Sequence, residues 1–146
     1  MKGQSLVVQF MLFFMIGLGL FITIGGIFRF HSDILREDVA ETSRELISSY
    51  ISSIAISMAS NCKDCNFTTY SLKLQSITAN YLTSLNFSTA TGLHVSSSPG
   101  GGNASASLHN LNESFVLIGN ATSSKSIVLK LNNTSRKQEF NLTYKP

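Results

Sequence analysis

The first part of this 146-residue sequence has few residues that break a helix or carry charge. Proline occurs only at Pro99 and Pro146, and no asparagine precedes position 61. Between residues 6 and 30 the one charged residue is Arg29. A soluble globular domain mixes these residue classes along its length. We therefore expect an apolar first part, followed by a part rich in Ser, Thr and Asn.

The chain also lacks the residue clusters that several functions require. Lys and Arg are scattered, with no run longer than Arg136-Lys137, whereas nucleic-acid binding needs a clustered basic face. The second part has few acidic residues, and none of its many serines lies in a G-x-S-x-G motif. We therefore expect no nucleic-acid partner, no catalytic residue, no cofactor and no enzyme activity.

Residues 6–30 form an uninterrupted apolar run, LVVQFMLFFMIGLGLFITIGGIFRF. As a helix they would extend about 37 Å, and a bilayer's hydrocarbon core is about 30 Å thick. A secretory signal peptide has a shorter apolar region followed by a small-residue cleavage site, which is missing here. The run therefore predicts a membrane-spanning helix. Gln9 could hydrogen-bond between such helices or be a tolerated single amide, and Gly17 and Gly19 allow close helix packing or a bend.

Residues 31–60 contain neither Gly nor Pro and repeat apolar side chains with a helical period. We therefore expect one helix from near Ser5 to about Ser60, amphipathic in its second half. Its apolar stripe is expected to pack on the part of the chain that follows. This stripe comprises Leu35, Val39, Leu46, Tyr50, Ile54 and Met58, widened by Ile47 and Ile51.

From about Thr68 the apolar residues alternate with polar ones, as in half-buried strands. The alternation covers residues 70–74, 115–117, 127–131 and 140–144. Turn signals lie at Thr91-Gly92, residues 98–103, Gly119-Asn120 and Asn132-Asn133. The expected fold class is α+β: a long N-terminal helix with a C-terminal antiparallel β-sheet or small β-sandwich head.

The first five residues, Met1 to Ser5, place a basic residue, Gly, Gln and Ser before the apolar helix. This start resembles the class III signal peptide of archaeal type IV pilin-like proteins, and the resemblance covers about the first 30 residues. In that family a membrane peptidase cuts after the Gly on the cytoplasmic side. The resemblance implies a cut between Gly3 and Gln4. Bacterial pilins carry Glu at the fifth mature position, where this chain has Val8.

The resulting organisation has four segments. We expect residues 1–3 to be the signal peptide, 4–30 the transmembrane or filament-core helix, 31–60 its amphipathic extension, and 61–146 an extracellular glycosylated head. We expect the cell membrane to hold the helix and the head to face outside, either on the cell surface or on an extracellular filament.

Eight of the eleven asparagines stand in N-x-S/T sequons. Each is a candidate glycan acceptor if the head is translocated. A Ser- and Thr-rich domain also produces sequons by chance, and two adjacent asparagines are not expected to be used together. The sequons are Asn66, Asn86, Asn103, Asn112, Asn120, Asn132, Asn133 and Asn141.

The two cysteines, Cys62 and Cys65, follow the predicted end of the helix. A disulfide that locks the junction between helix and head suits an external location. A redox pair would be expected near a βαβ pattern, which is not visible. A metal site would need two more ligands, and His31, His94 and His109 are scattered, so we expect no metal. The disulfide is the favoured prediction.

The resemblance implies a structural subunit of an archaeal cell-surface filament for adhesion or motility. Its partners would be copies of itself through the N-terminal helix, a prepilin peptidase, a pilus assembly ATPase with its membrane platform, and membrane lipid before assembly. The alternative is a membrane-retained minor pilin or stator-like accessory protein, whose head binds the surface layer or a filament. A third class is a membrane-tethered redox or binding protein that uses Cys62 and Cys65.

Overall fold

The computed structural model describes residues 2–62, 65–106, 108, 111–134 and 137–144, without the side chains of residues 2–5, 112 and 137. The chain forms two compact units, Met1–Arg36 and Glu37–Pro146. One helix, α1 (Lys2–Asn61), makes up the first unit and continues into the second. The predicted long helix is confirmed, with each end within a few residues of its expected position.

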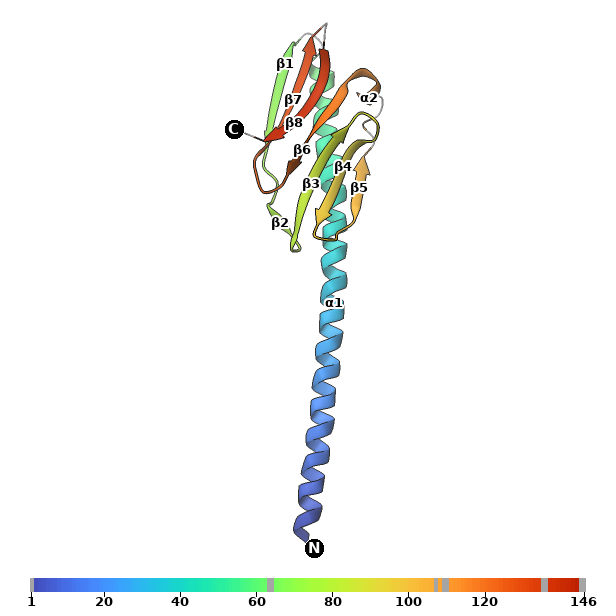
Figure 1. Ribbon diagram of the computed structural model, residues 1–146, viewed down its shortest axis with the longest axis vertical. Coiled ribbons are helices and arrows are strands. Elements are labelled where there is room, and N and C mark those ends of the chain that lie inside the picture. The colour runs from blue at the N-terminus through green and yellow to red at the C-terminus, as the bar shows by residue number, and fades with distance from the viewer. Residues whose placement is uncertain (1, 63–64, 107, 109–110, 135–136, 145–146) are drawn as a thin grey trace. The chain divides into compact units, whose positions relative to one another are not determined.

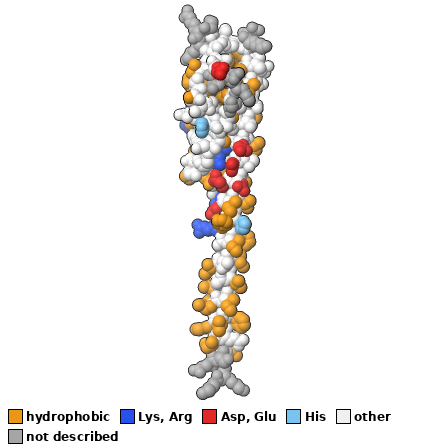
Figure 2. Space-filling model, turned by 90° about the vertical axis from the view of Figure 1, so that its right-hand side faces the viewer, with side chains coloured by type: hydrophobic (Ala, Val, Ile, Leu, Met, Phe, Trp, Pro, Cys, Tyr) orange, Lys and Arg blue, Asp and Glu red, His pale blue; other side chains and the backbone are white. Residues whose placement is uncertain are grey.

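The first unit is an apolar helix without an interior. Every large apolar side chain from Leu6 to Phe30 is exposed, from 48% at Leu18 to 78% at Phe21. Hydrophobic side chains accordingly cover this part of the surface in Figure 2. Thr23 satisfies its hydroxyl by donating to the carbonyl of Gly19 at 2.8 Å, one turn back. A surface of this kind is stable only where something apolar covers it.

The second unit combines the rest of α1 with an eight-stranded open sheet (Figure 1). The sheet follows the order β1-β7-β8-β6-β3-β4-β5, and β2 pairs with β3. All pairs are antiparallel except β6 with β8. This architecture confirms the predicted α+β class. Its elements are β1 (Phe67–Leu72), β2 (Ile77–Thr78), β3 (Tyr81–Ser88), β4 (Gly92–Ser98), β5 (Asn103–Ala106), α2 (Leu111–Ser114), β6 (Val116–Thr122), β7 (Ile127–Thr134) and β8 (Lys137–Tyr144).

The core lies between α1 and one face of this sheet. Strand β7 places Leu129 and Leu131 in the core with no exposed area, while Lys130 points to the other face, as the alternation predicts. Phe140 of β8 is equally buried and meets the ring of Phe115 edge-on at 5.2 Å. α1 contributes Ile51, Ala55, Met58 and, just after its end, Cys62. The second half of the helix therefore supplies part of the core of the head.

The predicted apolar stripe of α1 is wrong in its first half. Leu35, Val39, Leu46 and Tyr50 are exposed, whereas Ile54 is half-buried and Ile51 and Met58 are buried. Small residues allow a helix and a sheet to approach closely, so the face that packs contains few large apolar side chains. The residues of α1 that are buried in the second unit are Ala40, Arg44, Ser48, Ile51, Ser52, Ala55 and Met58.

Two of the predicted turns are also wrong. Gly119-Asn120 lies inside β6 and Asn132-Asn133 lies inside β7. Gly119 has φ +113°, and a Cβ there would lie 2.8 Å from the backbone nitrogen of Leu142 on β8. Glycine at position 119 therefore allows β6 and β8 to approach closely, and it does not form a turn. The predicted turn at Thr91-Gly92 does connect β3 to β4, and residues 98–103 connect β4 to β5.

Candidate functional site

The apolar helix of the first unit presents polar and small residues that no other part of its unit contacts. Gln9 is exposed. A Cβ added at Gly17 or Gly19, or at Gly25 or Gly26, would meet no heavy atom within 4 Å. The packing of a single chain therefore gives no reason for these glycines, and close approach of another helix would give one.

By length and composition, α1 is apolar enough to cross a membrane. The most apolar 18-residue window in its span from Leu6 has mean hydropathy 2.4 and no buried residue. A signal sequence near an N-terminus has the same properties, so the helix is a membrane anchor or a signal sequence. Gly3 and Gln4, the predicted cleavage residues, lie within α1, but their side chains are outside the described residues.

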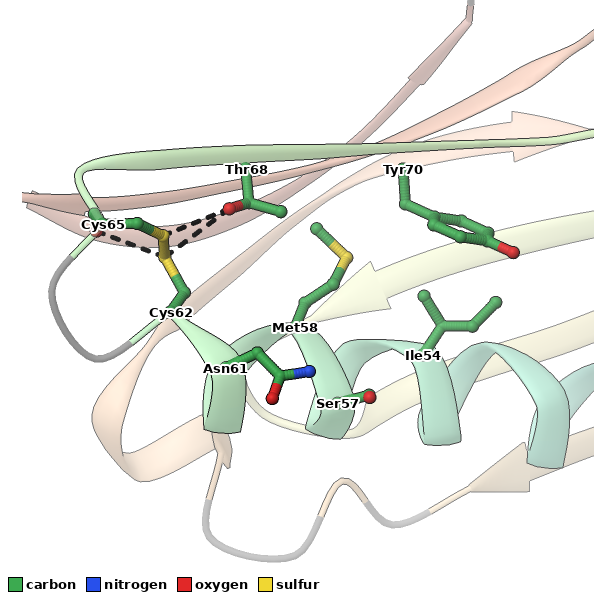
Figure 3. A pocket seen from close by; sticks show the side chains of 8 residues that line it. All are labelled: Ile54, Ser57, Met58, Asn61, Cys62, Cys65, Thr68 and Tyr70. Atoms are coloured by element: carbon green, nitrogen blue, oxygen red, sulfur yellow. Dashed lines mark hydrogen bonds between the residues drawn. A yellow bond between two sulfur atoms is a disulfide. The ribbon is translucent and has the colours of Figure 1, made fainter.

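A disulfide between Cys62 and Cys65 closes the junction between α1 and β1, as Figure 3 shows. Because disulfide sulfurs carry no hydrogen, the Thr68 hydroxyl is the donor to Cys65 Sγ, 3.1 Å away, and to Cys62 Sγ at 3.7 Å. Asn133 Nδ2 donates to the carbonyl of Cys62 at 2.9 Å. The junction is thereby tied to both β1 and β7. An open pocket of about 460 Å³ lies beside it, lined by Ile54, Ser57, Met58, Asn61, Cys62, Cys65, Thr68 and Tyr70.

The position of this disulfide favours a structural role. Cys62 follows the C-terminal end of α1, where the helix dipole disfavours a thiolate, whereas reactive Cys-x-x-C pairs are activated at helix N-termini. Its side chain is also buried. Among the described residues no three or more His, Cys, Asp or Glu side chains come together as metal ligands. His109 lies outside the described residues.

A buried arginine joins α1 to the end of the sheet in the second unit. Arg44 is only 3% exposed, and it donates from Nη2 to Glu37 Oε1 at 3.1 Å and from Nη1 to Ser97 Oγ at 3.2 Å. The arginine hydrogen bond is the main cause that lowers the pKa of Glu37, with smaller contributions from hydrogen bonds of Tyr81 and the Gly102 backbone. A Cβ on Gly102 would lie 2.8 Å from Arg44 Nη2, so glycine makes room for the guanidinium. Sequence reasoning missed this cluster, because a lone arginine in an amphipathic helix usually faces solvent.

The sequons gather on the face of the sheet that points away from the core. Asn86 of β3 and Asn120 of β6 are exposed and paired across the two strands. Asn103, Asn132 and Asn141 occupy the same face by strand alternation, opposite Ser96, Glu139 and Lys130 respectively. Asn66 is exposed just before β1, and the Asn112 side chain is outside the described residues.

Asn133 differs from the other sequon residues that the structure describes. It points toward the helix side, where its Nδ2 reaches Cys62 and its Oδ1 accepts from Gln138 Nε2 at 3.0 Å. Both polar atoms of the Asn133 amide group therefore form hydrogen bonds within the head, one of them to the junction.

Comparisons of the chain with protein-family models, curated proteins and solved structures found no match. The order and type of these elements, an apolar N-terminal helix followed by a head in which a helix packs on a mixed β-sheet, are pilin-like in architecture alone.

Proposed function

We propose that the chain is a pilin-like structural subunit of an archaeal cell-surface filament, used in adhesion or motility. The observation that carries the proposal is the apolar helix of residues 6–30, exposed along its whole length, with glycines that face open space. Covering eighteen large apolar side chains is favourable by an amount on the order of tens of kcal/mol. Lipid would cover them before assembly, and the helices of neighbouring copies would cover them in a filament core.

Assembly in this proposal needs the partners that the N-terminal resemblance implies. A prepilin peptidase cuts between Gly3 and Gln4, and an assembly ATPase with its membrane platform extracts the subunit. The head then lies outside the cell with glycans on its exposed sequons. The role is structural and assigns no catalytic residue.

The second candidate is a membrane-retained accessory protein, either a minor pilin or a stator-like component. Val116 and Ile118 of β6 expose apolar side chains on the outer face of the sheet. Such residues would give the head a surface for binding the surface layer or a filament.

Shearing of cells followed by sedimentation separates the two candidates. A filament subunit is recovered in the sheared fraction as its main component and begins at Gln4. An accessory protein stays in the membrane fraction. A Gly3→Asp variant should remain uncut and leave the sheared fraction, whereas Gly100→Ala, in an exposed loop, should be processed normally. Recovery of the native protein with Met1 intact would contradict the class III signal.

A further inference from the structure

The side of α1 that faces away from the sheet carries an apolar seam in the second unit. Val39, Leu46 and Tyr50 are 53%, 65% and 49% exposed, while Ala40 and Ile51 are buried against the sheet. We call the three exposed residues the outer seam. Their spacings of seven and four place them on one side of a helix. Tyr50 also reaches the sheet edge, where its hydroxyl lies 3.4 Å from that of Tyr70 on β1.

Acidic residues line one flank of the outer seam. Asp38 directly precedes Val39, and Glu45 directly precedes Leu46. Each residue of a helix is turned by about 100° from the one before it, so both carboxylates lie on the same side of the seam. Both side chains are exposed. Figure 2 shows acidic side chains gathered on the helix beside exposed apolar ones.

The end of the first unit carries the complementary pattern. Arg29 directly follows Phe28, and Arg36 directly follows Leu35, so the two basic residues are again seven positions apart. Phe28 and Leu35 are exposed. Because each base follows its apolar residue while each acid precedes its own, the bases and acids lie on opposite flanks of their apolar residues. Arg36 forms an ion pair with the exposed Asp33 at 3.7 Å, within its own unit.

Two helices that pack side by side in parallel bring opposite flanks together, whereas antiparallel helices bring like flanks together. A common offset of nine residues pairs Arg29 with Asp38 and Arg36 with Glu45 at once. Nine residues extend about 13 Å along a helix, so these pairs cannot form within one chain. Copies that a filament draws from a membrane with the same orientation are parallel and can differ by this axial step, whereas copies that span the membrane at one depth have no such offset.

We propose that Val39 and Leu46 of the outer seam dock a second copy of this chain, whose residues 28–37 lie parallel to them with Arg29 beside Asp38 and Arg36 beside Glu45. This inference rests on the proposed filament function, which it deepens by naming the contact. The apolar residues supply most of the attraction, and the exposed ion pairs set the register. Because the contact joins two different surfaces, each copy can bind one neighbour on either side, and the assembly does not close.

The test is thiol cross-linking of full-length protein in the sheared fraction, with the membrane fraction as a control in which copies at the same depth should give no ladder. An Arg36→Cys/Glu45→Cys double variant, treated with a short thiol-specific cross-linker, should give a ladder of covalent multimers. Each single variant should stay monomeric. The matched control is Arg36→Cys/Ser43→Cys, which places both thiols on the same flank and should give no ladder. The native cysteines are held in their own disulfide.

A charge exchange tests the register independently. Arg36→Glu should lower the cross-linked share of an otherwise suitable pair, Leu35→Cys with Leu46→Cys, roughly fivefold at low salt. Adding Glu45→Arg should restore it. A single reversal without effect, or one that Glu45→Arg fails to rescue, overturns the proposed register.

The outcomes separate this inference from the proposed function. Filaments that contain the chain but give no ladder overturn the docking surface and leave the filament role in place. A ladder in membranes, where copies lie at the same depth, overturns the nine-residue offset, and absence of the chain from the sheared fraction overturns the filament role. A urea unfolding midpoint equal to that of the native chain in each variant shows that the head has folded.

Discussion

The guanidinium of Arg44 donates to the carboxylate of Glu37 at 3.1 Å, seven residues back along the same helix. The arginine is buried, whereas the Glu37 side chain is about half exposed. The pair closes the end of the head where the loop between β4 and β5 meets α1, since Ser97 and Gly102 also contact this cluster.

This pair predicts an acid-sensitive head. The pKa of Glu37 is held below its usual value, mainly by the Arg44 hydrogen bond, so the carboxylate is favoured in the folded state. Its stabilisation is therefore present above the unfolded pKa and is lost as pH falls through the lowered folded value. Between about pH 5 and pH 3 the native chain should lose more stability than Glu37→Gln does.

Urea unfolding in detergent, followed by tyrosine fluorescence because the chain has no tryptophan, measures this difference. Asp38→Asn, which removes an exposed neighbouring acid, serves as the control and should keep the native pH dependence. An identical acid response of native protein and Glu37→Gln would disprove the assignment.

A second prediction concerns the close approach of β6 and β8. Gly119→Ala should destabilise the head by about 3 kcal/mol or more, because its Cβ would overlap the backbone of Leu142 at a positive φ. Gly100→Ala is the matched control, since Gly100 also has a positive φ but faces open space. It should cost about 1 kcal/mol from backbone conformation alone. Equal unfolding midpoints for the two variants would show that the strand contact has no such effect.

The sequence predicted the helix, the fold class and the strands of regular alternation, because these follow from period and composition. It did not predict the face on which the helix packs. Large exposed residues such as Leu46 dominate the apolar pattern, whereas the buried face is built around Ala40, Ser48 and Ala55. Which stripe is buried depends on the shape of the sheet, and local sequence does not record that shape.

The abundance of sequons has a structural cause as well. The described outer positions of the sheet are mostly Ser, Thr and Asn, and the inner positions are mostly small or apolar. In such a strand the Asn and the Ser or Thr of an N-x-S/T sequon both lie on the outer face, and the middle residue x is buried or half-buried. Examples of this middle residue are Phe87, Ala104, Ala121 and Leu142. The alternation therefore accounts for both the number of sequons and their position on the outer face.

The disulfide gives a third prediction. Replacing both Cys62 and Cys65 by Ala should lower the stability of the head by about 2 kcal/mol, the chain-entropy value for a loop this short. Reductant should lower the unfolding free energy of the native chain, measured by urea unfolding, by the same amount. It should leave the unfolding free energy of the double variant unchanged. Thr68→Val, which removes only the hydroxyl beside the sulfurs, is the control and should cost less. A native urea unfolding midpoint that does not change with reductant would contradict the structural role of the disulfide.

The last prediction separates two overlapping sequons. A glycan is attached to the side-chain amide nitrogen of asparagine. In Asn133 this nitrogen already donates a hydrogen bond to the Cys62 carbonyl at 2.9 Å. Asn132 instead lies on the outer face, opposite Glu139. We therefore expect the glycan on Asn132.

Thr134→Ala distinguishes the two asparagines, because Thr134 completes the sequon of Asn132, whereas Ser135 completes that of Asn133. Glycopeptide mass spectrometry should show the glycan on the native chain and its loss in Thr134→Ala. Asn133→Gln should keep the glycan, since it leaves the first sequon intact, but it should destabilise the head by about 1 kcal/mol through the lost hydrogen bond. A glycan that survives Thr134→Ala would place the acceptor at Asn133, and its attachment would then require the contact with Cys62 to be broken.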